Sequence, residues 1–352
     1  MYPQLVIDLK KLQENTKVLV DKCKAQGISV MGVTKVFCAD EKSAQAYVDG
    51  GVDYLADSRI ENLERLQFFA PKKVLLRLPM ISEAARVVEA ADITLNSEVA
   101  TIKAINQAAS AKGLVHEIIL MIDLGDLREG IMPVDFEATV SEITALENIQ
   151  LIGVGVNLTC YGGVVPNADN LGQISAFARR LESEYGLTLD IVSGGNSSSL
   201  YLLDRDGLPK GINNLRLGEA LVLGRETAFG DAIENTHQDA FQLVAEIIEM
   251  KEKPTLPIGE IGMDAFGNKP VFEDEGIKTR AILAVGRQDV NVDNIIPVDS
   301  RIRIFGASSD HLIVDLTEVA NDYKVGDTVT FNLEYGGLLS LATSPYVKRV
   351  YK

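Results

Sequence analysis

The sequence predicts an α/β protein in which a (β/α)8 TIM barrel is followed by a mostly β C-terminal domain. Strand-like and helix-like stretches alternate about eight times over roughly 200 residues, which is the rhythm of such a barrel. Near Thr236 the pattern changes to short β-rich runs. The 352 residues also exceed one ordinary domain. The predicted domains are residues 1–235 and 236–352, with the first strand, residues 2–8, as a candidate member of the β domain.

The barrel strands are predicted from short apolar runs rich in β-branched residues. In order, they cover residues 30–37, 53–56, 73–77, 92–95, 116–122, 151–157, 189–193 and 214–217. The helices between them carry stop signals, such as Gly186 after the apolar stripe from Leu171 to Tyr185. A doubly wound open sheet is the alternative fold, but no glycine-rich dinucleotide fingerprint follows the first strand.

The C-terminal domain is predicted from runs separated by turn residues such as Gly326-Asp327. Its candidate strands cover residues 242–248, 279–285, 301–305, 312–316 and 328–333.

Composition excludes several classes of function. The chain has 34 basic and 50 acidic residues, a net charge of -16, and no polybasic run, which argues against nucleic acid and anionic membrane and favours cationic ligands. Three widely spaced cysteines, Cys23, Cys38 and Cys160, indicate a reducing cytoplasm with neither a disulfide framework nor a metal site. No signal peptide or membrane span is expected.

Polar residues gather where the barrel strands end, which is where TIM barrels carry their sites. The first strand ends near Lys35, and a lysine at the mouth of an apolar core is partly desolvated, which lowers the pKa of its amine and suits Schiff-base chemistry. The alternative is an ammonium that points into water. The other strand ends supply Asp123 and Arg128, Asn157, the loop 193–198 and Arg216.

The loop 193–198 follows the seventh strand, a position that often binds phosphate in barrels. Its glycines allow close backbone approach, and the helix that follows favours an anion. The alternative is an ordinary turn with a helix N-cap.

Several segments together carry a family resemblance. They are Val33-Thr34-Lys35, the segment 123–130, Asn196-Ser197, Leu215-Arg216-Leu217-Gly218, the segment 306–315 and Tyr335-Gly336. In this order, and over nearly the whole length, they resemble the pyridoxal-phosphate enzymes of the alanine racemase type (fold type III), most closely the ornithine racemase branch.

The resemblance implies pyridoxal 5'-phosphate as cofactor, bound as a Schiff base to Lys35. Arg128 would contact the ring oxygen and the substrate carboxylate, and Arg216 would face the pyridine nitrogen and keep it unprotonated. The phosphate would be bound by Asn196, Ser197, Gly218 and Tyr335. Asn157 would contact the cofactor where the family has a histidine.

The implied activity is an isomerase that interconverts L- and D-ornithine, by proton abstraction and return at the α-carbon of a Lys35-derived aldimine. Racemisation of alanine, of lysine or of many amino acids is an alternative, as are a pyridoxal-phosphate decarboxylase and a non-catalytic cofactor carrier. The decarboxylases generally use a cysteine in the β domain, and here none follows Cys160. The carriers are lone barrels.

The second catalytic base departs from the family pattern. Arg287 stands where the family has a tyrosine, and an arginine is a poor proton acceptor. Asp310 and His311 are therefore the candidate catalytic residues beside Lys35. Arg287 and Asp289 are candidate substrate contacts, since the distal amine of a basic amino acid needs a carboxylate such as Glu219, Asp289 or Asp310. The family also implies a head-to-tail homodimer with shared active sites.

Overall fold

The computed structural model describes residues 1–264, 266–267 and 269–352. The chain forms two compact units, Lys10–His237 and a second unit made of Met1–Leu9 with Gln238–Lys352. Among the described residues, no helix has the length and hydropathy needed to cross a membrane.

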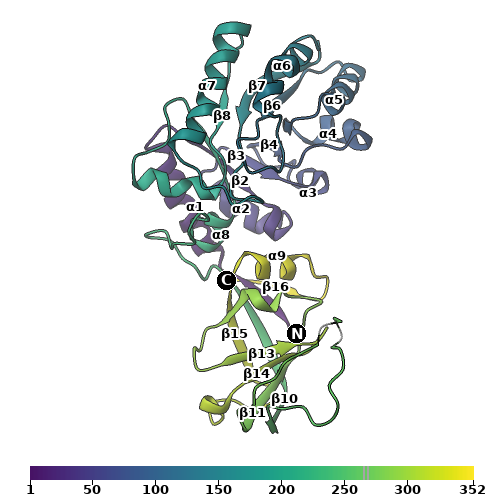
Figure 1. Ribbon diagram of the computed structural model, residues 1–352, viewed down its shortest axis with the longest axis vertical. Helices are drawn as coiled ribbons and strands as arrows, with labels where there is room; N and C mark the ends of the chain where they lie inside the picture. Colours follow the sequence, from purple (N-terminus) through teal and green to yellow (C-terminus); the bar gives the residue numbers. More distant parts are fainter. Residues whose placement is uncertain (265, 268) are drawn as a thin grey trace. The chain divides into compact units, whose positions relative to one another are not determined.

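The first unit is a closed barrel of eight parallel strands, which confirms the predicted fold (Figure 1). Neighbouring strands pair in sequence order, and β2 closes the barrel against β9 through the register Met31 to Arg216. The strands are β2 (Ser29–Val33), β3 (Tyr54–Asp57), β4 (Lys72–Leu75), β5 (Ile93–Asn96), β6 (His116–Met121), β7 (Ile149–Gly155), β8 (Ile191–Ser193) and β9 (Asn214–Leu217).

Two apolar layers hold the barrel together, because successive side chains of a strand point to opposite faces. Ile119 and Met121 of β6 fill the barrel interior, whereas Ile118 and Leu120 pack outward with residues of the helices. These helices surround the strands (Figure 1). They are α1 (Leu9–Lys24), α2 (Glu41–Asp49), α3 (Ile60–Arg65), α4 (Ala84–Ala90), α5 (Val99–Ala111), α6 (Phe136–Thr144), α7 (Ala168–Tyr185) and α8 (Glu219–Leu223).

The second unit is a mostly antiparallel sheet in the order β12-β15-β10-β11-β14-β13, together with the α-helix α9 (Tyr335–Thr343). Its strands are β10 (Phe241–Pro254), β11 (Ile277–Leu283), β12 (Ile295–Pro297), β13 (Arg303–Ala307), β14 (Leu312–Asp315), β15 (Thr328–Leu333) and β16 (Lys348–Tyr351). The N-terminal strand β1 (Gln4–Ile7) joins this sheet, antiparallel to β10 and parallel to β16.

Some strand ends differ from the sequence prediction. The first barrel strand ends at Val33 instead of continuing to residue 37, because Thr34 turns its hydroxyl to Asp57 and the chain enters a 3-10 helix, Lys35–Phe37. Strands β12 and β16 and helix α9 lie outside the runs that the sequence predicted. The two strands are only three and four residues long, so their patterns are too brief to distinguish from turns.

The pairing of β1 gives a testable prediction. Leu5 is fully buried and pairs with Leu243, so Leu5→Ala should lower the free energy of unfolding of the second unit by about 2–5 kcal/mol. Hydrogen exchange followed by mass spectrometry should then show faster exchange in β10 and β16, with unchanged protection in β2 to β9. Gln4→Ala, on the same strand but only half-buried, is the control. Faster exchange in the barrel strands alone would contradict this assignment.

Candidate active site

Lys35 lies just beyond the C-terminal end of β2, at the first position of the 3-10 helix. The strand before it is buried, but Lys35 itself is exposed to solvent in the single chain. The desolvation expected from the sequence is therefore absent at this lysine in the described structure. Gly218 directly follows the neighbouring strand β9, and a Cβ atom there would lie 3.2 Å from the Cβ of Val33. The ends of β2 and β9 therefore meet closely, with Lys35 two residues beyond Val33.

Arg216 is a buried cation at the end of β9. Its guanidinium donates to Ser193 Oγ (2.6 Å), to the Val156 carbonyl (2.9 Å) and to Asn157 Oδ1 (3.3 Å). These acceptors are neutral, and burial lowers the pKa of Arg216 to about 10. Since arginine has five N–H donors, the group can donate further to a ligand.

Asn157 and Asn196 connect neighbouring loops. Asn157 Oδ1 accepts from Asn196 Nδ2 (3.2 Å) as well as from Arg216. The carboxamide is thereby oriented so that Asn157 Nδ2 is buried without a hydrogen-bond partner among the described residues. A buried donor without an acceptor is costly, so this nitrogen is available to a ligand oxygen.

Ser197 joins the loop after β8 to the end of β9. Its hydroxyl accepts from the backbone N–H groups of Gly218 (3.4 Å) and Ala220 (3.2 Å). Asn196 fixes the turn itself by accepting from Ser198 N (2.8 Å), and Gly195 adopts a φ of +107°. The structure thus brings Asn196, Ser197 and Gly218 together.

Arg128 lies in the loop after β6 and forms a bidentate ion pair with Glu129, in which Nη2 is 2.6 Å from Oε1. This pair and a hydrogen bond to Cys160 raise the pKa of Arg128. Cys160 Sγ in turn accepts from Asn196 Nδ2 (3.3 Å). Arg128 is therefore linked through Cys160 to the same group of residues as Arg216.

Two aspartates shape the loops that carry these residues. Asp123 accepts from the N–H groups of Gly125 (2.8 Å) and Leu127 (3.1 Å), which turns the chain toward Arg128. Asp126 is almost fully buried and accepts from the N–H groups at positions 161 and 162. The loops after β6 and β7 are thereby fixed to each other, so Asp123 and Asp126 build the site rather than react in it.

The second unit brings Arg287 and His311 onto adjoining loops. Arg287 N donates to the Ser308 carbonyl (2.9 Å), and a Cβ atom at Gly286 would meet the Asp310 nitrogen at 2.4 Å, so only glycine fits there. His311 Nδ1 lies 2.7 Å from Asp310 Oδ1, and this contact lowers the pKa of Asp310.

Asp289 and Tyr335 occupy different environments in the same unit. Asp289 is buried and accepts a hydrogen bond from Ser344 Oγ (2.6 Å). Tyr335 is the first residue of α9, and Gly336 after it packs so closely on Asn294 that a Cβ atom would lie 2.2 Å from Asn294 Oδ1.

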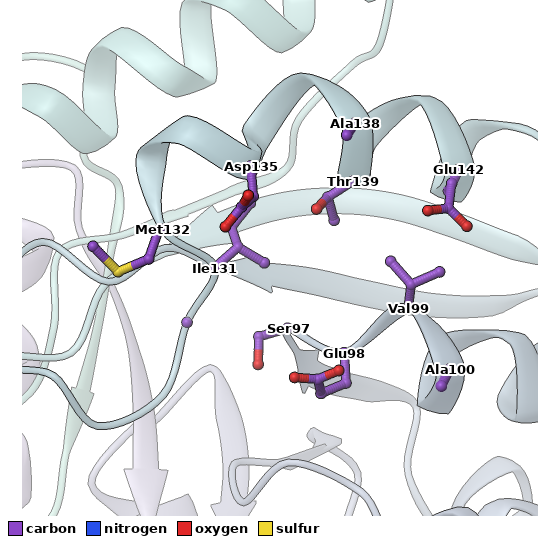
Figure 2. A pocket seen from close by; sticks show the side chains of 11 residues that line it. Ser97, Glu98, Val99, Ala100, Ile131, Met132, Asp135, Ala138, Thr139 and Glu142 are labelled. Carbon is purple, nitrogen blue, oxygen red and sulfur yellow. The ribbon is translucent and has the colours of Figure 1, made fainter.

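A cavity of about 410 Å³ opens between the beginnings of α5 and α6, outside the residues described above (Figure 2). Figure 2 shows Glu98 on one side of it and Asp135 and Glu142 on the other. Three carboxylates repel a phosphate group, so this cavity does not suit the expected cofactor. Among the described residues, no cluster of ligands suits a metal ion.

Sequence reasoning missed the parts of the site that depend on three-dimensional pairing. Glu129, Cys160 and Ser193 all contact the predicted residues. Glu129 and Ser193 lay in segments that the sequence had singled out, but neither was predicted as a site residue, and Cys160 lay outside those segments. Proximity of Glu129 to Arg128 in the chain was the one signal that could have identified the ion pair.

Comparison with known proteins agrees with the barrel fold and with the residues at its strand ends. The chain is 50% identical to ornithine racemase of Acetoanaerobium sticklandii over 99% of both chains, and 40% identical to lysine racemase of Thermotoga maritima over 100% of this chain and 99% of the other. Among solved structures, alanine racemase of Streptomyces coelicolor A3(2) has the same fold, with a TM-score of 0.76 at 18% identity over 99% of this chain and 97% of the other.

Residues 7–226 also match the family described as alanine racemase, N-terminal domain, a range that includes every barrel strand. The fold, the strand-end residues and these matches together establish that the chain belongs to the alanine racemase family.

Proposed function

We propose that this protein is a pyridoxal-phosphate-dependent amino-acid racemase whose principal substrate is ornithine, interconverted between its L and D forms. The choice of ornithine as substrate rests on the 50% identity to an ornithine racemase over 99% of both chains. The second candidate is lysine, because a lysine racemase is 40% identical over essentially the full length. Both relatives act on amino acids with a distal amine, so a basic side chain is the shared substrate feature.

Enzymes of this family depend on pyridoxal 5'-phosphate. The residues at the barrel strand ends suit this group. Asn157 Nδ2 is a buried donor that needs an acceptor, and among the described residues the buried cation Arg216 donates hydrogen bonds to neutral acceptors. In the proposal, Asn196, Ser197, Gly218 and Tyr335 hold the phosphate, and Arg128 and Asn157 contact the ring and substrate oxygens.

The cofactor, when bound, withdraws electrons from the α-carbon of the amino acid and so acidifies its α-proton. Lys35 holds the cofactor and, once released, accepts or returns the α-proton on one face. Arg216 would face the ring nitrogen and oppose a second positive charge there. Arg128, oriented by Glu129, pairs with the substrate carboxylate, and a planar guanidinium suits that bidentate contact.

His311 is proposed as the base on the opposite face. Its Nδ1 atom bonds to Asp310, and its Nε2 atom has no hydrogen-bond partner among the described residues. A carboxylate that orients an imidazole in this way favours proton acceptance at the other ring nitrogen, because it stabilises the imidazolium that forms. Asp310 then acts together with His311.

Arg287 and Asp289 are proposed as substrate contacts. Arg287 is exposed and pairs weakly with Asp293 (3.8 Å), so its guanidinium can engage a carboxylate. Asp289 keeps one carboxylate oxygen for Ser344, and the other is available to a distal ammonium.

A head-to-tail homodimer would supply both halves of the site. Large apolar side chains are exposed on loops after β4, β6 and β7, as expected of a surface that another subunit covers. They are Met80, Ile81, Leu127, Met132, Val134 and Tyr161. A cytoplasmic location is also proposed, supported by three free cysteines at positions 23, 38 and 160.

The first test concerns cofactor and substrate. The pure protein should show the visible absorption of an imine-bound pyridoxal phosphate, and Lys35→Ala should abolish it, whereas Lys103→Ala on α5 should not. In deuterated water, chiral analysis of an amino-acid panel should show faster inversion of ornithine than of lysine or alanine. A wild-type protein that stays colourless after incubation with the cofactor would rule out the proposal.

The second test separates the two bases. His311→Gln should slow inversion by about 100-fold or more, the range expected for loss of a general base. One enantiomer should still exchange its α-proton for deuterium, because Lys35 continues to serve its face. His237→Gln is the matched control, since His237 pairs with Glu14 in the barrel unit (2.8 Å). Loss of deuteration for both enantiomers alike would argue against His311 as the opposite-face base.

The third test concerns the shared sites. Lys35→Ala and His311→Gln proteins should each be inactive, and a mixture that exchanges subunits should recover activity, because one site of each mixed dimer then has both residues. Sedimentation should give a dimer mass. Full activity from a strict monomer would refute the shared site.

A further inference from the structure

A buried polar pair lies directly behind Lys35, at the ends of β2 and β3. We propose that Thr34 and Asp57 are positioning residues that hold the Lys35 amine where it meets cofactor and substrate. Neither residue takes part in the family resemblance as a ligand or base. The inference deepens the proposed function and rests on the role of Lys35 given there.

Asp57 is fully enclosed and hydrogen-bonded on both oxygens. Oδ2 accepts from Thr34 Oγ1 at 2.6 Å, and Oδ1 accepts from Arg59 N (2.9 Å) and Asn62 Nδ2 (3.0 Å). Burial raises the pKa of Asp57, and the bonds from Thr34 and Asn62 oppose that effect. A buried carboxyl group with this many donors is held rigidly, so it is a fixed support for Thr34.

Thr34 connects Asp57 to the turn that contains Lys35. Its carbonyl accepts from the N–H groups of Phe37 (3.3 Å) and Ala39 (3.2 Å). Cys38 and Ala39 have φ angles of 54° and 49°, a left-handed conformation that residues with a Cβ atom rarely adopt. The Thr34 carbonyl therefore holds a strained turn closed immediately after Lys35.

Strained backbone persists only where the surroundings determine it, and it is common at sites that position a reacting group. Without the Thr34–Asp57 bond, the left-handed pair could relax, and the backbone of Lys35 would shift with it. The pair does not touch the reacting atoms, so its effect reaches the amine only through the position of the main chain.

The test replaces the Thr34 hydroxyl by a methyl group of the same shape, as Thr34→Val. Thr34→Ser, which keeps the hydroxyl, is the conservative rescue. Asp53→Asn is the matched control, because Asp53 accepts from Val30 N (2.8 Å) and so links the same two strands at the opposite end of the barrel. Thermal melts and circular dichroism establish that each variant is folded.

Two measurements follow Lys35. The rate of imine formation with pyridoxal phosphate should fall by about 10-fold or more in Thr34→Val, since a displacement near 1 Å can cost about 100-fold in rate. The extent of acylation of Lys35 in cofactor-free Thr34→Val protein should also differ from that in the wild type. It is quantified by mass spectrometry against exposed Lys10. Thr34→Ser and Asp53→Asn should both match the wild type.

Wild-type imine formation and acylation in a folded Thr34→Val protein would overturn the inference. If Thr34→Val does not fold, Asp57→Asn replaces it and is judged by the same two measurements. The acylation measurement separates this inference from the proposed function. A wild-type protein that forms no imine would refute the function, while the acylation of Lys35 would still report whether Thr34 positions it.

Discussion

Closure of the barrel between β2 and β9 is the constraint on which the site depends. Asn214 at the start of β9 donates to Ser29 Oγ of β2 (3.1 Å) and accepts from Ser193 Oγ of β8 (2.9 Å). The same Ser193 hydroxyl accepts from Arg216. A series of side-chain hydrogen bonds therefore crosses the strands that close the barrel and ends at the buried guanidinium of Arg216. The strand pairing and the position of Arg216 are thus determined together.

Burial of that cation has a cost that the protein itself does not fully offset. Ser193, Val156 and Asn157 supply hydrogen bonds but no negative charge. Groups that stay charged and buried without an ion pair are common at functional sites, where a ligand completes them. The unsatisfied Asn157 amide beside Arg216 fits this view, because both would be completed by one ligand with acceptor atoms.

The fold could be predicted because barrel strands carry local signals, namely buried β-branched runs at regular spacing. The sequence offered the first strand as a candidate member of the β domain, but its pairing with β10 and β16 could not be predicted. These segments are more than 200 positions apart, and nothing in four residues specifies a partner. The predicted end of the first barrel strand was also wrong. The strand stops at the hydrogen bond from Thr34 to Asp57, and this bond depends on a residue of the neighbouring strand. The types of residue at the strand ends of the site could be predicted. Contacts such as that of Cys160 with Asn196 could not, because they form only when the loops fold next to each other.

The proposed substrate contacts would couple substrate choice to the second unit. A basic amino acid needs a negative partner for its distal ammonium. Asp123 and Asp126, the aspartates nearest Arg128 in the chain, are already bonded to backbone N–H groups, and Glu129 is paired with Arg128. The partner proposed above is Asp289 of the second unit, which lies close in sequence to Arg287. If subunits share their sites as proposed, the residue that selects the side chain and the base that completes racemisation both belong to the partner's second unit, so substrate selection and two-base catalysis would require the dimer.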